Sequence, residues 1–148
     1  MASWIIPCNP KFYDVEGAFS HLRKVNWKQS RSIDVGDDVY IYVGSPIKAI
    51  LFRCCATKVN LPRVEIDDSA FVKHGEVFER YGNYMELELK QSFLHEQLTL
   101  DRLQAAGMKG NVQGPRQVTP DLQHLLAVEE ETIFSSKEMM RDEYGRRL

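Results

Sequence analysis

The stretch Val35-Gly36-Asp37-Asp38-Val39-Tyr40-Ile41-Tyr42-Val43-Gly44 decides the fold that we expect for this chain. It opens on a glycine-containing turn signal and closes on a second glycine, and the side chains between them alternate in character. One face of the predicted strand carries Val39, Ile41 and Val43, and the other carries Tyr40 and Tyr42. Successive side chains of a strand point to opposite faces, so this alternation predicts a strand over 38–43.

Working outward from this strand, the pattern predicts further strands and short helices. Apolar, β-branched or alternating runs indicate strands over 3–8, 48–59 and 84–91. Helices are expected over 14–24, over 100–106 after a Thr99 cap, and from Thr119-Pro120-Asp121 onward. The fold class is therefore α+β: a small curled mixed sheet or pseudo-barrel flanked by helices.

The length of 148 residues suits one domain with a single core. We expect this domain to span residues 1–128. From Glu129 onward the apolar pattern weakens and charge dominates. Residues 129–148 are therefore expected to form a charged helix, a tail or a linker.

Charge is unevenly distributed along the chain. The net charge of −2 argues against a generic polyanion binder. However, the first 33 residues hold five basic and two acidic side chains, whereas residues 120–148 hold four basic and seven acidic ones. The basic end of the chain coincides with Trp27, which makes it the expected side for a nucleic acid partner, although solvated surface charge is the simpler explanation.

The same composition predicts a cytoplasmic protein without a membrane partner. The chain has no run of about 18 apolar residues, and its N-terminus lacks the basic and apolar regions of a signal peptide. Of the three cysteines, Cys54 and Cys55 are adjacent, which does not suggest a disulfide framework. We expect a reducing compartment, no metal and no cofactor.

Trp27 is the first candidate binding residue. It lies in the polar segment Asn26-Trp27-Lys28-Gln29-Ser30, which we expect to connect the first helix to the next strand. An aromatic ring in such a setting can stack a nucleobase for about 1–3 kcal/mol. Lys28, Gln29 and Arg31 can then reach phosphates or a base edge. The alternatives are an indole that caps the core and neighbours that are only solvated.

The remaining candidates lie at corners of the predicted fold. Asn9 follows the first strand at an Asn-Pro turn, Ser45 follows the strand over 38–43, and Tyr42 offers a pocket wall. Turn chemistry and packing under a helix are the alternatives. The complete set of predicted nucleic-acid-binding residues is Asn9, Trp27, Lys28, Gln29, Ser30, Arg31, Tyr42, Ser45, Tyr81 and Asn83. No catalytic or metal-binding residue is expected.

The order of these motifs resembles that of an EVE domain, a member of the PUA-like group that also includes YTH-type modified-base readers. The resemblance covers roughly residues 1–126 and rests on the Asn-Pro corner, the helix, and three quoted segments. These segments are Asn26–Ser30, Val35–Gly44 and Tyr81-Gly82-Asn83-Tyr84-Met85-Glu86-Leu87-Glu88-Leu89. The resemblance implies a small β-barrel with an aromatic pocket for a flipped, often methylated base.

The resemblance also implies a biological setting. Bacterial EVE domains are often joined to a nuclease, commonly of the HNH type, in modification-dependent restriction systems. This chain carries no such module, so the implied role is binding of 5-methylcytosine or 5-hydroxymethylcytosine in DNA, with any nuclease fused or supplied by a partner. The alternative within the same fold is an RNA-binding module that reads a modified RNA base.

Two readings from other classes remain open. Glu88-Leu89-Lys90 with Asp67 or Asp68 upstream imitates the ligand set of metal-dependent nucleases, although an alternating strand accounts for it as well. A protein-interaction module that uses the acidic C-terminal end predicts no binding of nucleic acid.

Overall fold

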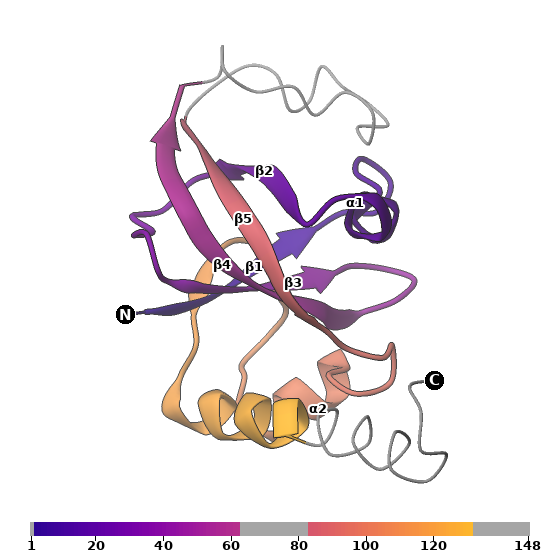
Figure 1. The fold of residues 1–148 in the computed structure, drawn as a ribbon. Coiled ribbons are helices and arrows are strands. Elements are labelled where there is room, and N and C mark those ends of the chain that lie inside the picture. Colours follow the sequence, from indigo (N-terminus) through magenta and orange to yellow (C-terminus); the bar gives the residue numbers. More distant parts are fainter. Residues whose placement is uncertain (1, 63–82, 132–148) are drawn as a thin grey trace, which may run out of the picture.

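The computed structural model describes residues 2–62 and 83–131, which form a curled α+β fold (Figure 1). Within these residues a six-stranded sheet has the order β2-β5-β4-β3-β1-β6. The strands are β1 (Ser3–Cys8), β2 (Lys24–Gln29), β3 (Asp38–Val43), β4 (Ala49–Leu61), β5 (Asn83–Ser92) and β6 (Arg116–Gln117). The helices are α1 (Val15–His21), α2 (Leu100–Ala105) and a C-terminal helix over 120–131. The predicted fold class is confirmed.

The sheet is mixed, and two of its strands, β1 and β2, have edges that are not fully paired. β1 and β3 are parallel, with Pro7 opposite Tyr42, and the other neighbouring strands are antiparallel. β6 covers the outer edge of β1 only at Trp4 and Ile5. In the described chain, β1 from Ile6 onward therefore has an edge without a strand partner, and β2 pairs with β5 alone. These two free edges border the site described below.

Both faces of β3 are buried, and each face packs into a different hydrophobic cluster. Val39, Ile41 and Val43 belong to one hydrophobic cluster, and Tyr40 and Tyr42 belong to the other. α1 adds Val15 and Ala18 to the first cluster. α2 and the C-terminal helix lie together beneath the sheet and add Leu103, Leu122 and Leu126 to the second (Figure 1). The predicted faces of this strand are confirmed.

The first helix is shorter than the sequence pattern suggested. Its N-cap is Asp14, whose Oδ1 accepts a hydrogen bond from the Gly17 amide at 3.0 Å. The helix ends at His21, because Leu22 already has an extended backbone with φ −123° and ψ 144°. Lys24 therefore begins β2 instead of ending the helix.

The expectation that Trp27 lies in a connecting segment is wrong. Trp27 is in the middle of β2, opposite Met85 of β5. Val25 and Trp27 point toward the first cluster, while Lys24 and Lys28 are exposed. The sequence did not reveal this strand because it is short and only two of its six residues, Val25 and Trp27, are apolar.

The two later helices begin as predicted. Thr99 caps α2, where its Oγ1 accepts from the Arg102 amide at 3.3 Å, and Gly107 follows with φ +111°. The C-terminal helix continues past residue 128, and Glu129 is 7% exposed. The division of the chain between residues 128 and 129 stays a prediction. In the described part of the chain, no helix has both the length and the apolar character needed to cross a membrane.

The Thr99 cap leads to a measurable expectation. Thr99→Ala removes the acceptor for the Arg102 amide and should lower the free energy of unfolding by about 1 kcal/mol. Thr99→Ser keeps the hydroxyl and serves as the matched control. Urea unfolding of the three proteins provides the measurement, and equal midpoints for the alanine and serine variants would contradict a capping role.

Asp37 ties the start of the chain to the turn before β3. Its carboxylate is 2% exposed; Oδ1 accepts from the Ala2 amide at 3.0 Å, and Oδ2 accepts from the Asp34 amide at 3.0 Å and the Trp4 indole at 3.1 Å. Burial raises the pKa of Asp37, but these hydrogen bonds to the charged form outweigh it and hold the pKa below its ordinary value. Asp37 is therefore a buried carboxylate that joins three segments.

Candidate functional site

The candidate site is a cavity that lies where the ends of β1 and β3 approach the free edge of β2. Its volume is about 630 Å³, within the range of pockets that enclose a small molecule. Its lining combines five aromatic rings with amides, a serine and two lysines. The lining residues are Pro7, Cys8, Asn9, Lys11, Phe12, Tyr13, Asn26, Trp27, Lys28, Tyr42, Gly44, Ser45, Tyr84, Val112 and Gln113.

The Asn9 turn builds the rim on the β1 side. The Asn9 carbonyl accepts from the amides of Phe12 at 3.0 Å and Tyr13 at 3.2 Å. Its side-chain Oδ1 accepts from the Lys11 amide at 3.0 Å, as in an Asx-turn. This bond engages the amide oxygen of Asn9, so its amide nitrogen is the group left to donate to a ligand. The predicted Asn-Pro turn is confirmed.

A backbone contact holds the ends of β1 and β3 together at the cavity. The Gly44 amide donates to the Cys8 carbonyl at 2.9 Å, and the Gly44 carbonyl accepts from the Ile47 amide at 3.1 Å. Ser45 follows directly and is exposed on the cavity lining. The serine is therefore positioned by the same turn that ends β3.

Trp27 forms an aromatic wall on the opposite side. The indole is half-buried and packs against the first hydrophobic cluster. Its ring centroid is 5.2 Å from that of Tyr13, with an angle of 73° between the ring planes. This edge-to-face contact fixes the orientation of the indole without a parallel ring lying on it. Because the half-buried indole lines the cavity, it is the candidate surface for stacking a planar ligand.

Tyr42 brings a buried hydroxyl to the cavity. Its side chain is 2% exposed, and its hydroxyl has no hydrogen-bond partner among the described residues. Burial raises the pKa of Tyr42, so the phenol remains protonated at neutral pH. A buried polar group without a partner is uncommon and destabilising, which makes this hydroxyl a candidate ligand contact.

The electrostatic character of the cavity is cationic. Lys11 and Lys28 line it, and no carboxylate does so in the part of the chain that the structure describes. Neither lysine forms an ion pair with a described residue, whereas the basic side chains of the outer sheet face do. An anion that approaches the cavity therefore meets positive charge that no described side chain neutralises through an ion pair.

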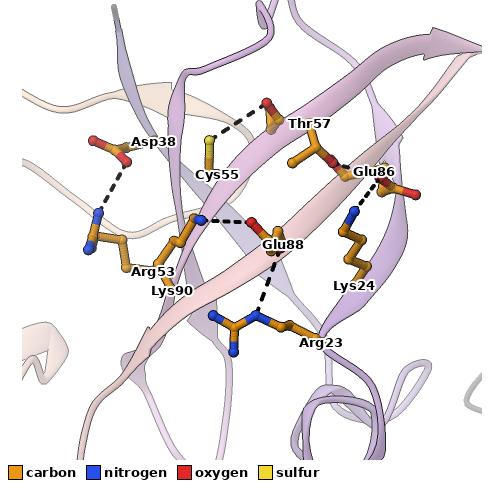
Figure 2. Close-up of polar contacts among 10 residues, drawn as sticks. Arg23, Lys24, Asp38, Arg53, Cys55, Thr57, Glu86, Glu88 and Lys90 are labelled. Atoms are coloured by element: carbon orange, nitrogen blue, oxygen red, sulfur yellow. Dashed lines mark hydrogen bonds and ion pairs between the residues drawn. The ribbon is translucent and has the colours of Figure 1, made fainter.

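The outer face of β5 shows the contrast (Figure 2). Glu88 lies between Lys90, whose Nζ is 2.7 Å from Oε1, and Arg23, whose Nε is 3.8 Å from Oε2. Glu86 is 3.7 Å from Lys24. The hydrogen bond from Lys90 holds the pKa of Glu88 below its ordinary value. On this face three basic side chains pair with two carboxylates. The nuclease-like pattern also requires Asp67 or Asp68, and both lie outside the described residues.

Of the ten predicted site residues, five line the cavity as described: Asn9, Trp27, Lys28, Tyr42 and Ser45. Ser30 borders a smaller hollow of about 120 Å³ that Trp27 and Lys28 also line. Arg31 is exposed away from the cavity lining, and Tyr81 lies outside the described residues.

Gln29 and Asn83 are placed elsewhere, opposite each other at the ends of β2 and β5. Gln29 is occupied with Asn60: its Nε2 donates to Asn60 Oδ1 at 3.2 Å, and its Oε1 accepts from the Asn60 amide at 2.8 Å. Gln29 therefore braces β2 against β4 and does not line the cavity.

Several lining residues were missed by sequence reasoning. Lys11, Phe12 and Tyr13 follow the Asn9 turn, and two adjacent aromatic residues after a turn were a usable signal. Val112 and Gln113 come from the glycine-rich loop before β6. Nothing in that loop marks it as a pocket wall, because its position depends on contacts between segments distant in sequence.

No protein-family model matches the sequence, and a comparison with curated proteins found no match. Several solved structures nevertheless share its fold. An ASCH protein from Zymomonas mobilis has a TM-score of 0.60 and 12% identity, over 86% of this chain and 94% of that one. A hypothetical protein from Leishmania major has a TM-score of 0.60 and 14% identity, over 89% and 96% of the two chains.

The third similar structure is human THYN1 protein in complex with 5-methylcytosine-containing DNA. Its TM-score is 0.60 and its identity 10%, over 88% of this chain and 98% of that one. At such low identity these similarities show the fold alone. The chain has a PUA-like α+β fold, of the type found in these ASCH and THYN1 structures.

Proposed function

We propose that this chain is a modified-base-binding module of the EVE type that takes a base flipped out of DNA into the cavity beside Trp27. The proposed ligand is 5-methylcytosine or 5-hydroxymethylcytosine, and the proposed setting is a cytoplasmic modification-dependent restriction system. The role is binding, with cleavage left to a fused or partner nuclease. The observation that carries the proposal is a cavity with aromatic walls, two lysines that form no ion pair with a described residue, and no carboxylate among its described lining residues.

The chemistry of the lining supports a nucleobase as ligand. Trp27 offers a stacking surface, and Asn9, Asn26 and Ser45 offer polar groups for a base edge. Lys11, on the turn after β1, and Lys28, on β2, both line the cavity, where they can contact the flanking phosphates. The DNA complex of the THYN1 structure, which shares the fold, supports DNA over RNA as the first polymer to test.

The free energies of the separate contacts indicate that binding is weak and that the modification adds only a small preference. Flipping a base out of the duplex costs a few kcal/mol. Stacking returns about 1–3 kcal/mol, and each hydrogen bond adds about 0.5–1.5 kcal/mol. A buried methyl group adds only about 0.8 kcal/mol, or about four-fold in affinity. The methyl group therefore cannot supply the binding, and stacking and polar contacts must do so.

The proposal is tested by titrating matched duplexes that contain cytosine, 5-methylcytosine or 5-hydroxymethylcytosine, with single-stranded RNA as competitor. We expect a modest preference for a modified duplex, near the four-fold set by one methyl group. Equal affinity for all three duplexes would contradict recognition of the modification. Stronger competition by RNA than by modified DNA would favour an RNA-binding module instead.

The two lysines of the cavity lining give a prediction about the salt dependence of binding. If Lys11 and Lys28 each neutralise one phosphate, replacing both with glutamine should reduce the slope of log Kd against log salt by about 2. Lys90→Gln is the matched control, because Lys90 already pairs with Glu88 at 2.7 Å. Titrations at several salt concentrations give the slopes. The same slope for the double variant and the native chain would show that these lysines do not contact phosphate.

A further inference from the structure

We infer that the Tyr42 hydroxyl reads a hydrogen-bond acceptor on the inner edge of the bound base, and that it identifies the base and not its modification. This inference rests on the proposed function. It assigns the ligand a chemical requirement: an acceptor atom, such as the C2 carbonyl oxygen or N3 of a cytosine, at the end of the base that enters the cavity first.

The first support is the contrast between Tyr42 and the other buried polar side chains of the sheet. Tyr40 lies two residues away on the same face of β3, and its hydroxyl donates to Glu130 Oε1 at 2.7 Å. The Trp4 indole donates to Asp37 at 3.1 Å. Arg53 Nε is buried without a hydrogen bond, but Glu130 lies 3.5 Å from it. In the described residues, the Tyr42 hydroxyl has neither kind of partner.

The second support is position. Tyr42 lines the cavity and Tyr40 does not, so of these two tyrosines the one whose buried hydroxyl lacks a described hydrogen-bond partner is the one whose side chain borders the cavity. Tyr42 lies opposite Pro7 in the β1–β3 pair, and both residues line the cavity. Its 2% exposure places it deeper than Asn9 and Ser45, which are exposed lining residues. A ligand that reaches the Tyr42 hydroxyl has therefore entered past the rim.

The third support is the chemistry of a protonated phenol. Because burial raises its pKa, Tyr42 keeps its proton at neutral pH and offers a donor. A phenylalanine would fill the same space without an unsatisfied hydroxyl. The hydroxyl therefore destabilises the ligand-free protein, and a hydrogen bond to an acceptor on the ligand would remove this destabilisation.

In cytosine, the atoms that identify the base and the group that carries the modification lie on different parts of the ring. The C2 carbonyl lies across the ring from C5, which carries the methyl or hydroxymethyl group. A hydroxyl that contacts the acceptor edge therefore contributes equally to modified and unmodified cytosine. Loss of this contact should lower both affinities by the same factor and leave their ratio unchanged.

The test compares Tyr42→Phe with Tyr40→Phe. We expect Tyr42→Phe to weaken binding of modified and unmodified duplexes by about 10-fold each, without lowering the melting temperature. Tyr40→Phe should have the opposite signature, with a lower melting temperature and unchanged affinity, because its hydroxyl bonds Glu130 outside the cavity. A further arm uses duplexes whose target base has C–H in place of N3 or lacks the C2 carbonyl. The native chain should bind one of these altered bases more weakly than it binds cytosine. Tyr42→Phe should bind that altered base and cytosine with equal affinity.

The outcomes separate the inference from the proposed function. Unchanged affinity of Tyr42→Phe for a duplex that the native chain binds would overturn the inference and leave the proposed function standing. So would a Tyr42→Phe variant that loses only its preference for the modified base. Failure of the native chain to bind any of the duplexes or RNA would overturn the proposed function itself.

Discussion

Trp27→Ala is expected to raise the Kd for a modified duplex by about 5- to 150-fold, which corresponds to the loss of one base–aromatic stacking contact of about 1–3 kcal/mol. Trp27 is half-buried, lines the cavity and has its orientation fixed by the edge-to-face contact with Tyr13. Fluorescence anisotropy with a labelled duplex measures the change. Trp27→Phe keeps an aromatic face and should recover most of the affinity.

The alanine variant also removes packing, so it needs a control for stability. Leu89 is partly buried against the same hydrophobic cluster but does not line the cavity. Leu89→Ala should therefore destabilise the fold and leave the Kd unchanged. If Leu89→Ala and Trp27→Ala weaken binding to the same extent, the effect of the indole is general destabilisation and the stacking role is wrong.

Asp37→Asn is expected to lower the free energy of unfolding by about 2–4 kcal/mol. The carboxylate accepts three hydrogen bonds, and an amide of the same shape can accept on only one of its two terminal atoms. The side-chain nitrogen of the asparagine would then face either the Ala2 amide or the N–H groups of Trp4 and Asp34, and it cannot accept a hydrogen bond from them. Urea unfolding at neutral pH measures the loss, and Asp34→Asn at the neighbouring exposed carboxylate is the control.

The same carboxylate makes stability depend on pH in a defined direction. Because the folded-state pKa of Asp37 lies below its ordinary value near 3.8, its contribution is fully present above that value. The contribution is lost as the pH falls below about 4 and through the folded-state pKa. Asp37→Asn should therefore have a flatter dependence of unfolding free energy on pH in that acidic range. Parallel curves for the variant and the native chain would contradict this account.

Elements whose pattern is local could be predicted from the sequence. The strand over 38–43 could be recognised because Val and Ile side chains occupy one face and Tyr side chains the other, and each face packs into its own cluster. α2 was predictable because its cap at Thr99 and its ending at Gly107 are both encoded within a few residues. The Asn9 turn belongs to the same group.

Features that depend on distant segments could not be predicted. Asp37 was expected to be part of a turn, and its bonds to Ala2 and Trp4 join residues more than 30 positions apart. Five predicted residues converge on the cavity because β2 and β1 are brought together by the curl of the sheet, which sequence spacing does not reveal. Gln29 has the right chemistry for a base edge, but its partner is Asn60.

The indole signals of the protein give the most direct test of the central claim, that Trp27 is the surface on which the base stacks. The chain has two tryptophans, so its nitrogen–proton NMR spectrum should contain two indole signals, which Trp4→Phe assigns. Trp4 is 8% exposed and bonded to Asp37, away from the cavity, so it serves as an internal reference. On addition of a duplex with 5-methylcytosine, the account predicts that the Trp27 signal shifts and the Trp4 signal stays in place. A duplex that binds while the Trp27 signal remains unmoved at saturation would contradict it.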